Sequence, residues 1–86
     1  MTIEQLRTAV NVDGVSDVIL KGEGADFQVH IALRNGGTSV LSTARSSAPR
    51  TFSNPATAFN ALLDAGITQC RIEASAWNPR AANNAR

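Results

Sequence analysis

The chain has 86 residues and a formal net charge of +1, with eight Lys and Arg against seven Asp and Glu, and only 5% aromatic residues with no Tyr. A domain this short buries only about 60% of the surface that its unfolded chain exposes, so a homodimer would relieve a small core. Because the net charge is near zero, no overall electrostatic field steers the chain toward nucleic acid or membrane. A single Cys excludes an intramolecular disulfide.

The N-terminal segment lacks the basic start and long apolar centre of a signal peptide, and no apolar run approaches the roughly 20 residues that span a bilayer. Together with the single Cys, these features predict a cytoplasmic protein.

The N-terminal half predicts a short helix followed by strands. Residues 2–5 (TIEQ) fit a capping box, which starts a helix of eight or nine residues. Residues 15–21 are rich in β-branched side chains and predict a strand, followed by a flexible hairpin loop over 22–26. Residues 27–34 alternate strictly, which predicts a strand with one wet face. The residues expected to face inward are Phe27, Val29, Ile31 and Leu33.

A hairpin is predicted to follow at Asn35-Gly36, a dipeptide that supplies both positive-φ positions of a two-residue turn. Pairing Arg34 with Gly37 gives a third strand that runs to about Ala44. Its outward residues in this register are Ser39, Leu41, Thr43 and Arg45. Residues 46–49 are then a short polar connection within one domain.

The segment from Arg50 to Trp77 predicts a second helix and a final strand. Asn54 is the expected N-cap, and Gly66 is expected to end the helix near Ala65. The apolar stripe expected to face inward contains Pro55, Ala58, Phe59, Leu62 and Leu63. Beyond Thr68 the period changes to two, with Cys70, Ile72, Ala74 and Ala76 inward and Arg71, Glu73, Ser75 and Trp77 outward. Residues 78–86 have no apolar period and predict a disordered tail.

These elements predict an α+β fold of order α-β-β-β-α-β in a single domain over residues 1–77. Two helices cover one face of an antiparallel β-meander, and the last strand returns to the edge of its own sheet or to a partner chain. The uncovered face is where a function is expected. Its candidate residues are Arg34, Arg45, Arg71 and Trp77, with Arg50 beside it. Three interpretations stay open, namely an ordinary solvated face, a protein or dimer interface, and a nucleic-acid surface.

The sequence predicts no enzyme, cofactor or metal site. His30 and Cys70 are single residues of their kinds, and alternation places them on opposite faces of the sheet, which disfavours a nucleophilic pair. One His and one Cys are too few for a structural zinc site, and no carboxylates are paired by spacing. Gly22 and Gly24 lack the residues that complete a phosphate-binding loop.

The pattern Arg50-x-Phe52 with Ala58, followed by Leu62-Leu63 with Gly66-Ile67 and a strand that ends in Trp, resembles small plasmid-borne partition-associated proteins of the class often labelled ParC. The resemblance implies plasmid maintenance beside other plasmid-encoded proteins, without enzymatic activity. A second likeness is to the AP2-like arm-binding domains of phage integrases, which present a three-stranded sheet to DNA.

From these features we expect a dimeric, non-enzymatic accessory module of a bacterial mobile element. It would act through protein contacts made by the uncovered sheet face and the last strand. The alternative is a DNA-binding module that uses the basic residues of that face. Its contacts would be Arg34, Arg45, Arg50, Arg71 and Trp77.

Overall fold

The computed structural model describes residues 1–46 and 48–78 and confirms the α+β fold. Two helices and five strands follow one another along the chain. They are α1 (Ile3–Asn11), β1 (Val15–Gly24), β2 (Asp26–Leu33), β3 (Thr38–Val40), β4 (Thr51–Phe52), α2 (Pro55–Asp64) and β5 (Arg71–Trp77). The order matches the predicted one, except that the third strand is shorter than expected and the two-residue β4 is added before α2.

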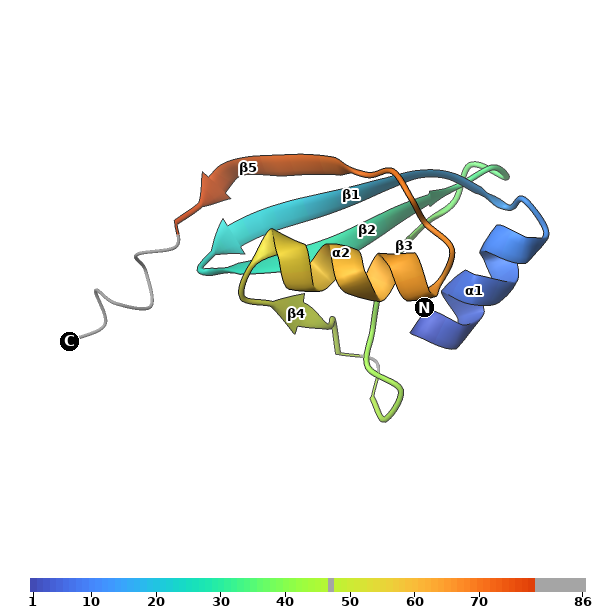
Figure 1. The fold of residues 1–86 in the computed structure, drawn as a ribbon, viewed down its shortest axis with the longest axis horizontal. Helices are drawn as coiled ribbons and strands as arrows, with labels where there is room; N and C mark the ends of the chain where they lie inside the picture. The colour runs from blue at the N-terminus through green and yellow to red at the C-terminus, as the bar shows by residue number, and fades with distance from the viewer. Residues whose placement is uncertain (47, 79–86) are drawn as a thin grey trace.

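The strands form one mixed sheet in the order β3-β2-β1-β5 (Figure 1). Strands β1, β2 and β3 are antiparallel neighbours, as the meander predicts, and β4 pairs with the part of β2 that β3 leaves free. Strand β5 returns to its own sheet and lies parallel to β1. It is the terminal strand on that side, so among the described residues it has a strand neighbour on one side only.

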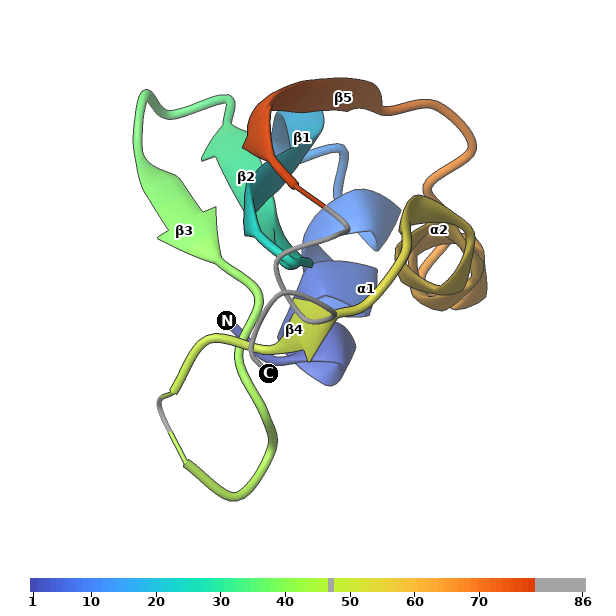
Figure 2. The ribbon, with the colours of Figure 1, turned by 90° about the vertical axis from the view of Figure 1, so that its left-hand side faces the viewer.

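Both helices lie on the same side of the sheet, as the end-on view of Figure 2 shows. The core between them contains Leu6 of α1 and Ala58 and Leu62 of α2, each fully buried. The sheet contributes alternate residues of its central strands, namely Val18, Leu20, Phe27, Val29 and Ile31. This alternation confirms the inward set predicted for β2, although Leu33 at the strand end is only half-buried.

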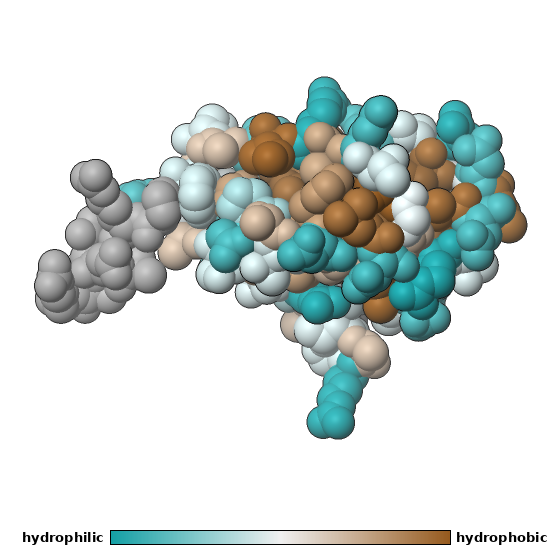
Figure 3. Space-filling view, viewed as in Figure 1, coloured by the Kyte–Doolittle hydropathy of each residue, from teal (hydrophilic) through white to brown (hydrophobic). Residues whose placement is uncertain are grey.

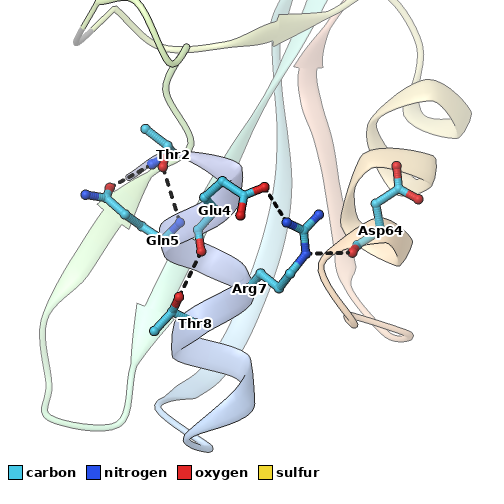
Figure 4. Close-up of polar contacts among 6 residues, drawn as sticks. All are labelled: Thr2, Glu4, Gln5, Arg7, Thr8 and Asp64. Carbon is cyan, nitrogen blue, oxygen red and sulfur yellow. Dashed lines mark hydrogen bonds and ion pairs between the residues drawn. The ribbon is translucent and has the colours of Figure 1, made fainter.

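The capping box predicted for α1 is present (Figure 4). The Gln5 backbone amide donates to the Thr2 hydroxyl at 3.2 Å, and the Thr2 backbone amide donates to Gln5 Oε1 at 2.9 Å. Arg7 then joins the helices, because its side chain bonds Glu4 in the same helix and its Nε donates to the Asp64 carbonyl at the end of α2, at 3.3 Å. A cation at that position also complements the negative end of the α2 dipole.

Helix α2 begins and ends where the sequence predicts. The Asn54 side chain accepts from the Thr57 amide at 2.8 Å. At the other end, Gly66 has φ +93°, its amide donates to the Leu63 carbonyl, and the Ile67 amide donates to the Leu62 carbonyl, both at 3.0 Å. This pair of bonds is the Schellman motif, in which the left-handed residue is usually Gly.

The first hairpin differs from its prediction, because β1 and β2 continue through the expected flexible loop. Glu23 pairs with Asp26, so only Gly24 and Ala25 form the turn. Gly24 has φ +60°, as the first position of a type II′ turn requires.

The second hairpin also differs, because its loop has three residues, 34–36, instead of two. The Leu33 amide donates to the Gly37 carbonyl at 2.8 Å, and Gly36 takes φ +94°, which is the pattern of a type I turn followed by a left-handed residue. Consequently His30, and not Ile31, pairs with Val40. The one-residue shift turns the strand over, so Leu41 is fully buried and its predicted outward orientation is wrong.

The predicted tail falls on residues 79–86, outside the described residues, except for Asn78. The Asn78 amide donates to the Gly24 carbonyl at 2.6 Å and so extends the contact between β5 and β1 by one residue.

Candidate functional site

The sheet face opposite the helices carries mixed charges. One row of neighbours across β5, β1, β2 and β3 is Arg71, Ile19, His30 and Val40, and the next row contains Glu73, Lys21 and Gln28. His30 Nε2 lies 3.3 Å from Gln28 Oε1. Acidic and basic side chains alternate over this face, so it has no excess of positive charge for a phosphate backbone.

Two of the predicted basic candidates are held by acidic partners. Arg71 lies on the uncovered face, where its guanidinium is 2.6 Å from the Asp17 carboxylate. Arg34 lies in the second hairpin loop and reaches Asp13, whose carbonyl it contacts at 2.8 Å and whose carboxylate it contacts at 3.2 Å. Each pair lowers the positive charge available to a ligand at its position.

The other two arginines lie away from that face. Arg45 is exposed in the loop between β3 and β4. Arg50 places its guanidinium 5.0 Å from the centre of the Phe52 ring, a cation–π distance. The four arginines therefore come from different parts of the fold, and neither Arg45 nor Arg50 belongs to the residue rows of the uncovered face.

Trp77 faces the helix side of the sheet, so its predicted outward orientation is wrong. Its ring centre lies 4.7 Å from that of the buried Phe27, and its Nε1 donates to the Ala25 carbonyl at 3.2 Å. The cause is a bulge in the pairing with β1, because Glu73 pairs with Lys21 but Ala76, and not Ser75, pairs with Glu23. One extra residue reverses the alternation for the rest of the strand.

His30 and Cys70 lie on opposite faces of the sheet, as predicted. His30 is on the uncovered face, whereas Cys70 packs against the edge of the core. Burial raises the pKa of the Cys70 thiol above its ordinary value, which favours the protonated and less nucleophilic form.

An apolar groove between α2 and β5 is the most distinctive surface of the described chain. It has a volume of about 680 Å³. Pro55, Ala56 and Phe59 form its α2 side, Leu20 its floor, and Ile72 and Cys70 its β5 side, with Thr68 and Gln69 at one end. We call this surface, together with the free edge of β5, the β5 groove. Figure 3 shows apolar residues gathered over the area between the two elements.

The groove exists because α2 covers only part of the sheet. Its buried residues, Ala58 and Leu62, belong to the core that β1 and β2 share. Ile72 pairs with the buried Leu20 and therefore points to the helix side, yet it is 56% exposed. Leu63 is 46% exposed and lies one turn after Phe59 on the same side of α2.

The predicted burial of Leu63 and Ile72 is therefore wrong, although the sequence pattern places both in the core. The helical period of α2 is as predicted, and Ile72 precedes the bulge of β5, but the described residues leave these two side chains exposed. No sequence motif marks the β5 groove, and its only signal is an apolar pattern wider than the core of so small a domain.

A second and smaller cleft, of about 360 Å³, lies between the end of α1, the start of β1 and the residues before β5. Asp13, Asp17 and Arg71 line it. Asp13 is paired with Arg34, and Asp17 is paired with Arg71. None of these three charged side chains therefore offers an unpaired charge to a ligand in the cleft.

Within residues 1–46 and 48–78, no three His, Cys, Asp or Glu side chains gather closely enough to hold a metal ion. Neither helix of this part of the chain has the length and apolar character needed to cross a membrane. Comparisons with known protein families, with curated proteins and with solved structures found no match to this chain.

Proposed function

We propose that this domain is a protein-interaction module that binds an extended polypeptide at the β5 groove. The observation that carries the proposal is Ile72, an apolar side chain oriented toward the core side of the sheet but 56% exposed on a terminal strand. A strand added to β5 would satisfy the free backbone groups of that edge, and its alternate side chains would enter the groove. A small apolar ligand would fill the groove but would leave the backbone edge unpaired.

We further propose that the module is a non-enzymatic accessory of a bacterial plasmid or other mobile element, in maintenance or partition. This part rests on the resemblance of residues 50–77 to ParC-type proteins. Binding at the β5 groove fits such a role because an accessory protein acts by assembling with other chains. The mixed charge of the uncovered face and the ion pairs of Arg34 and Arg71 favour a protein partner over DNA.

The test is a selection of random peptides on the sparsely immobilised full chain, followed by affinity measurements with two matched variants. Ile72→Asp places a charge in the groove, and Val12→Asp places one at an equally apolar position that is 72% exposed at the end of α1. The selected peptides should be extended and apolar, and Ile72→Asp should weaken them about tenfold or more while Val12→Asp leaves them unchanged. Selected peptides that bind Ile72→Asp as well as the wild type would overturn the proposal.

A further inference from the structure

Two side chains with the pattern of core residues remain exposed, one in the β5 groove and one on the adjoining turn of α2. Ile72 of β5 lines the groove, and Leu63 follows the groove residue Phe59 by one turn of α2. The third large apolar residue that is exposed in the described chain, Val12, ends a different helix. A chain of 86 residues has little apolar area to spare for its own core. The exposed pair is therefore the strongest sign of a surface that another chain covers.

We infer that a second copy of this chain occupies the β5 groove. The two β5 strands pair antiparallel about a two-fold axis that passes beside Ile72, and the two sheets become one. This inference rests on the proposed function, since it uses the same edge and groove, and it adds the identity and the register of the partner. A two-fold contact of this kind is self-complementary, the commonest arrangement in oligomers.

The charges of β5 select the register. With Ile72 at the axis, Arg71 lies opposite the partner's Glu73 and Glu73 lies opposite the partner's Arg71, on the uncovered face. Directly opposed charges of opposite sign stabilise an antiparallel pair, and opposed like charges destabilise it. An axis at Arg71 or Glu73 would place like charges against each other. An axis at Ala74 would place the bulge, which lies between Glu73 and Ala76, in the middle of the pairing.

The same axis also brings the apolar sides of the helices together. A two-fold axis perpendicular to a continuous sheet leaves the helices of both copies on one face of it. Phe59 lines the groove on the β5 side of α2, so this side of the helix faces the axis. Phe59 and Leu63 of one copy then lie toward the partner's Phe59 and the partner's Leu63. Ile72 meets the partner's Ile72 between the helices and the sheet, and the groove is closed.

The oligomeric state of the full chain tests the inference. Sedimentation equilibrium should give a mass near twice the 9.1 kDa of the monomer, with a dissociation that follows concentration. Ile72→Asp brings two carboxylates together in an apolar contact and should weaken the dimer by about 100-fold or more. Val12→Asp should leave the dissociation constant unchanged. Circular dichroism of both variants at the same concentration checks that each is folded.

Charge reversal tests the register without removing an apolar group. In the homodimer of Arg71→Glu the two side chains of each opposed pair are both acidic, and in the homodimer of Glu73→Arg they are both basic. Each variant alone should dimerise about tenfold more weakly than the wild type, because two attractive pairs become repulsive. An equimolar mixture of the two variants should form a heterodimer that is tighter than either homodimer. In this mixture one chain is acidic and the other is basic at both positions, so every opposed pair is attractive whichever residue lies at the axis. A further variant therefore tests the Ile72 axis.

That further variant is the double exchange Arg71→Glu with Glu73→Arg in one chain. It restores opposite charges in both opposed pairs of the homodimer, and we expect it to dimerise within about threefold of the wild type. It also carries both substitutions at once, so any damage that either causes to the fold would remain in it. Recovery of the dimer in the double exchange therefore reports the pairing of positions 71 and 73 across the axis.

The outcomes separate this inference from the proposed function. A wild-type chain that remains monomeric at about 0.1 mM overturns the second-copy inference, and so does a dimer that Ile72→Asp leaves intact. In either case, peptides whose affinity depends on Ile72 would still support the β5 groove as a site for another protein. A dimer that Ile72→Asp disrupts but that the double exchange fails to restore overturns the Ile72 register.

Discussion

Gly22 in β1 offers the sharpest test of how β5 is seated on the sheet. Gly22 is buried beneath Trp77, and a Cβ atom at this position would lie 2.5 Å from the Trp77 Cβ and 3.0 Å from the Phe27 Cε1. Carbon atoms pack at about 3.5–4.0 Å, so Gly22→Ala requires a shift of about 1 Å. The Trp77 Cβ is bonded to the backbone, and no rotamer change moves it away. The backbone of β1 or of the end of β5 must therefore shift by about this distance.

The expected cost follows from two opposing effects. Overpacking of a core typically costs about 1–3 kcal/mol, whereas replacing Gly by Ala inside a strand gains about 0.5–1 kcal/mol. We expect Gly22→Ala to lower the free energy of unfolding by about 1–2 kcal/mol. For a domain of this size that corresponds to a fall in Tm of about 4–16 °C.

Thermal unfolding followed by circular dichroism measures this change, at one fixed protein concentration because self-association raises Tm. Trp77 is the only Trp of the chain, so its fluorescence reports the same displacement locally. Trp77→Gly supplies the control, because it removes the contacted atoms. In that background Gly22→Ala should cost less than about 0.5 kcal/mol, a coupling of about 1 kcal/mol between the positions. An equal cost in both backgrounds would refute the argument.

Three other predictions concern separate parts of the chain. Asn54→Ala removes the acceptor for the Thr57 backbone amide and should lower the free energy of unfolding by about 1 kcal/mol, measured by urea unfolding. Asn54→Asp keeps an acceptor there and should retain most of the wild-type stability. Burial raises the Cys70 pKa, so folded protein should react with a thiol reagent more slowly than unfolded chain at about pH 8; equal rates would contradict this. The stabilisation linked to this raised pKa is present below the unfolded pKa and is lost as pH rises through the folded one. A labelled random duplex should show no anisotropy change at moderate salt because Arg34 and Arg71 are ion-paired, and binding that falls steeply with salt would restore the DNA hypothesis.

The helix ends were predictable because their signals are local. Thr2 and Gln5 cap the start of α1, Asn54 caps the start of α2, and Gly66 ends α2. Each of these caps involves only a few neighbouring residues, and its geometry depends on little else. The structure has these contacts where the sequence places them. The alternation of β2 was predictable for a similar reason, since a central strand with one covered face repeats its pattern over its full length.

The orientations of Leu41 and Trp77 were not predictable from alternation. A single extra residue in the second hairpin loop and a single bulged residue in β5 each turn the following side chains over. Whether such a residue is inserted depends on which pairing buries more apolar surface, a comparison between strands far apart in the chain. Both irregularities bring a large apolar side chain to the core side, which is the physical reason for their presence.

The types of the elements, their order and the helix caps could be read from the residues alone, because they follow from the period of apolar residues and from contacts within one turn. Only the tertiary structure decided two further features. Strand β5 pairs with its own sheet, and α2 leaves the core side of that strand partly uncovered. Coverage depends on where a helix crosses the sheet, which no local pattern records. Leu63 and Ile72 therefore have the sequence pattern of core residues and the exposure of a binding surface.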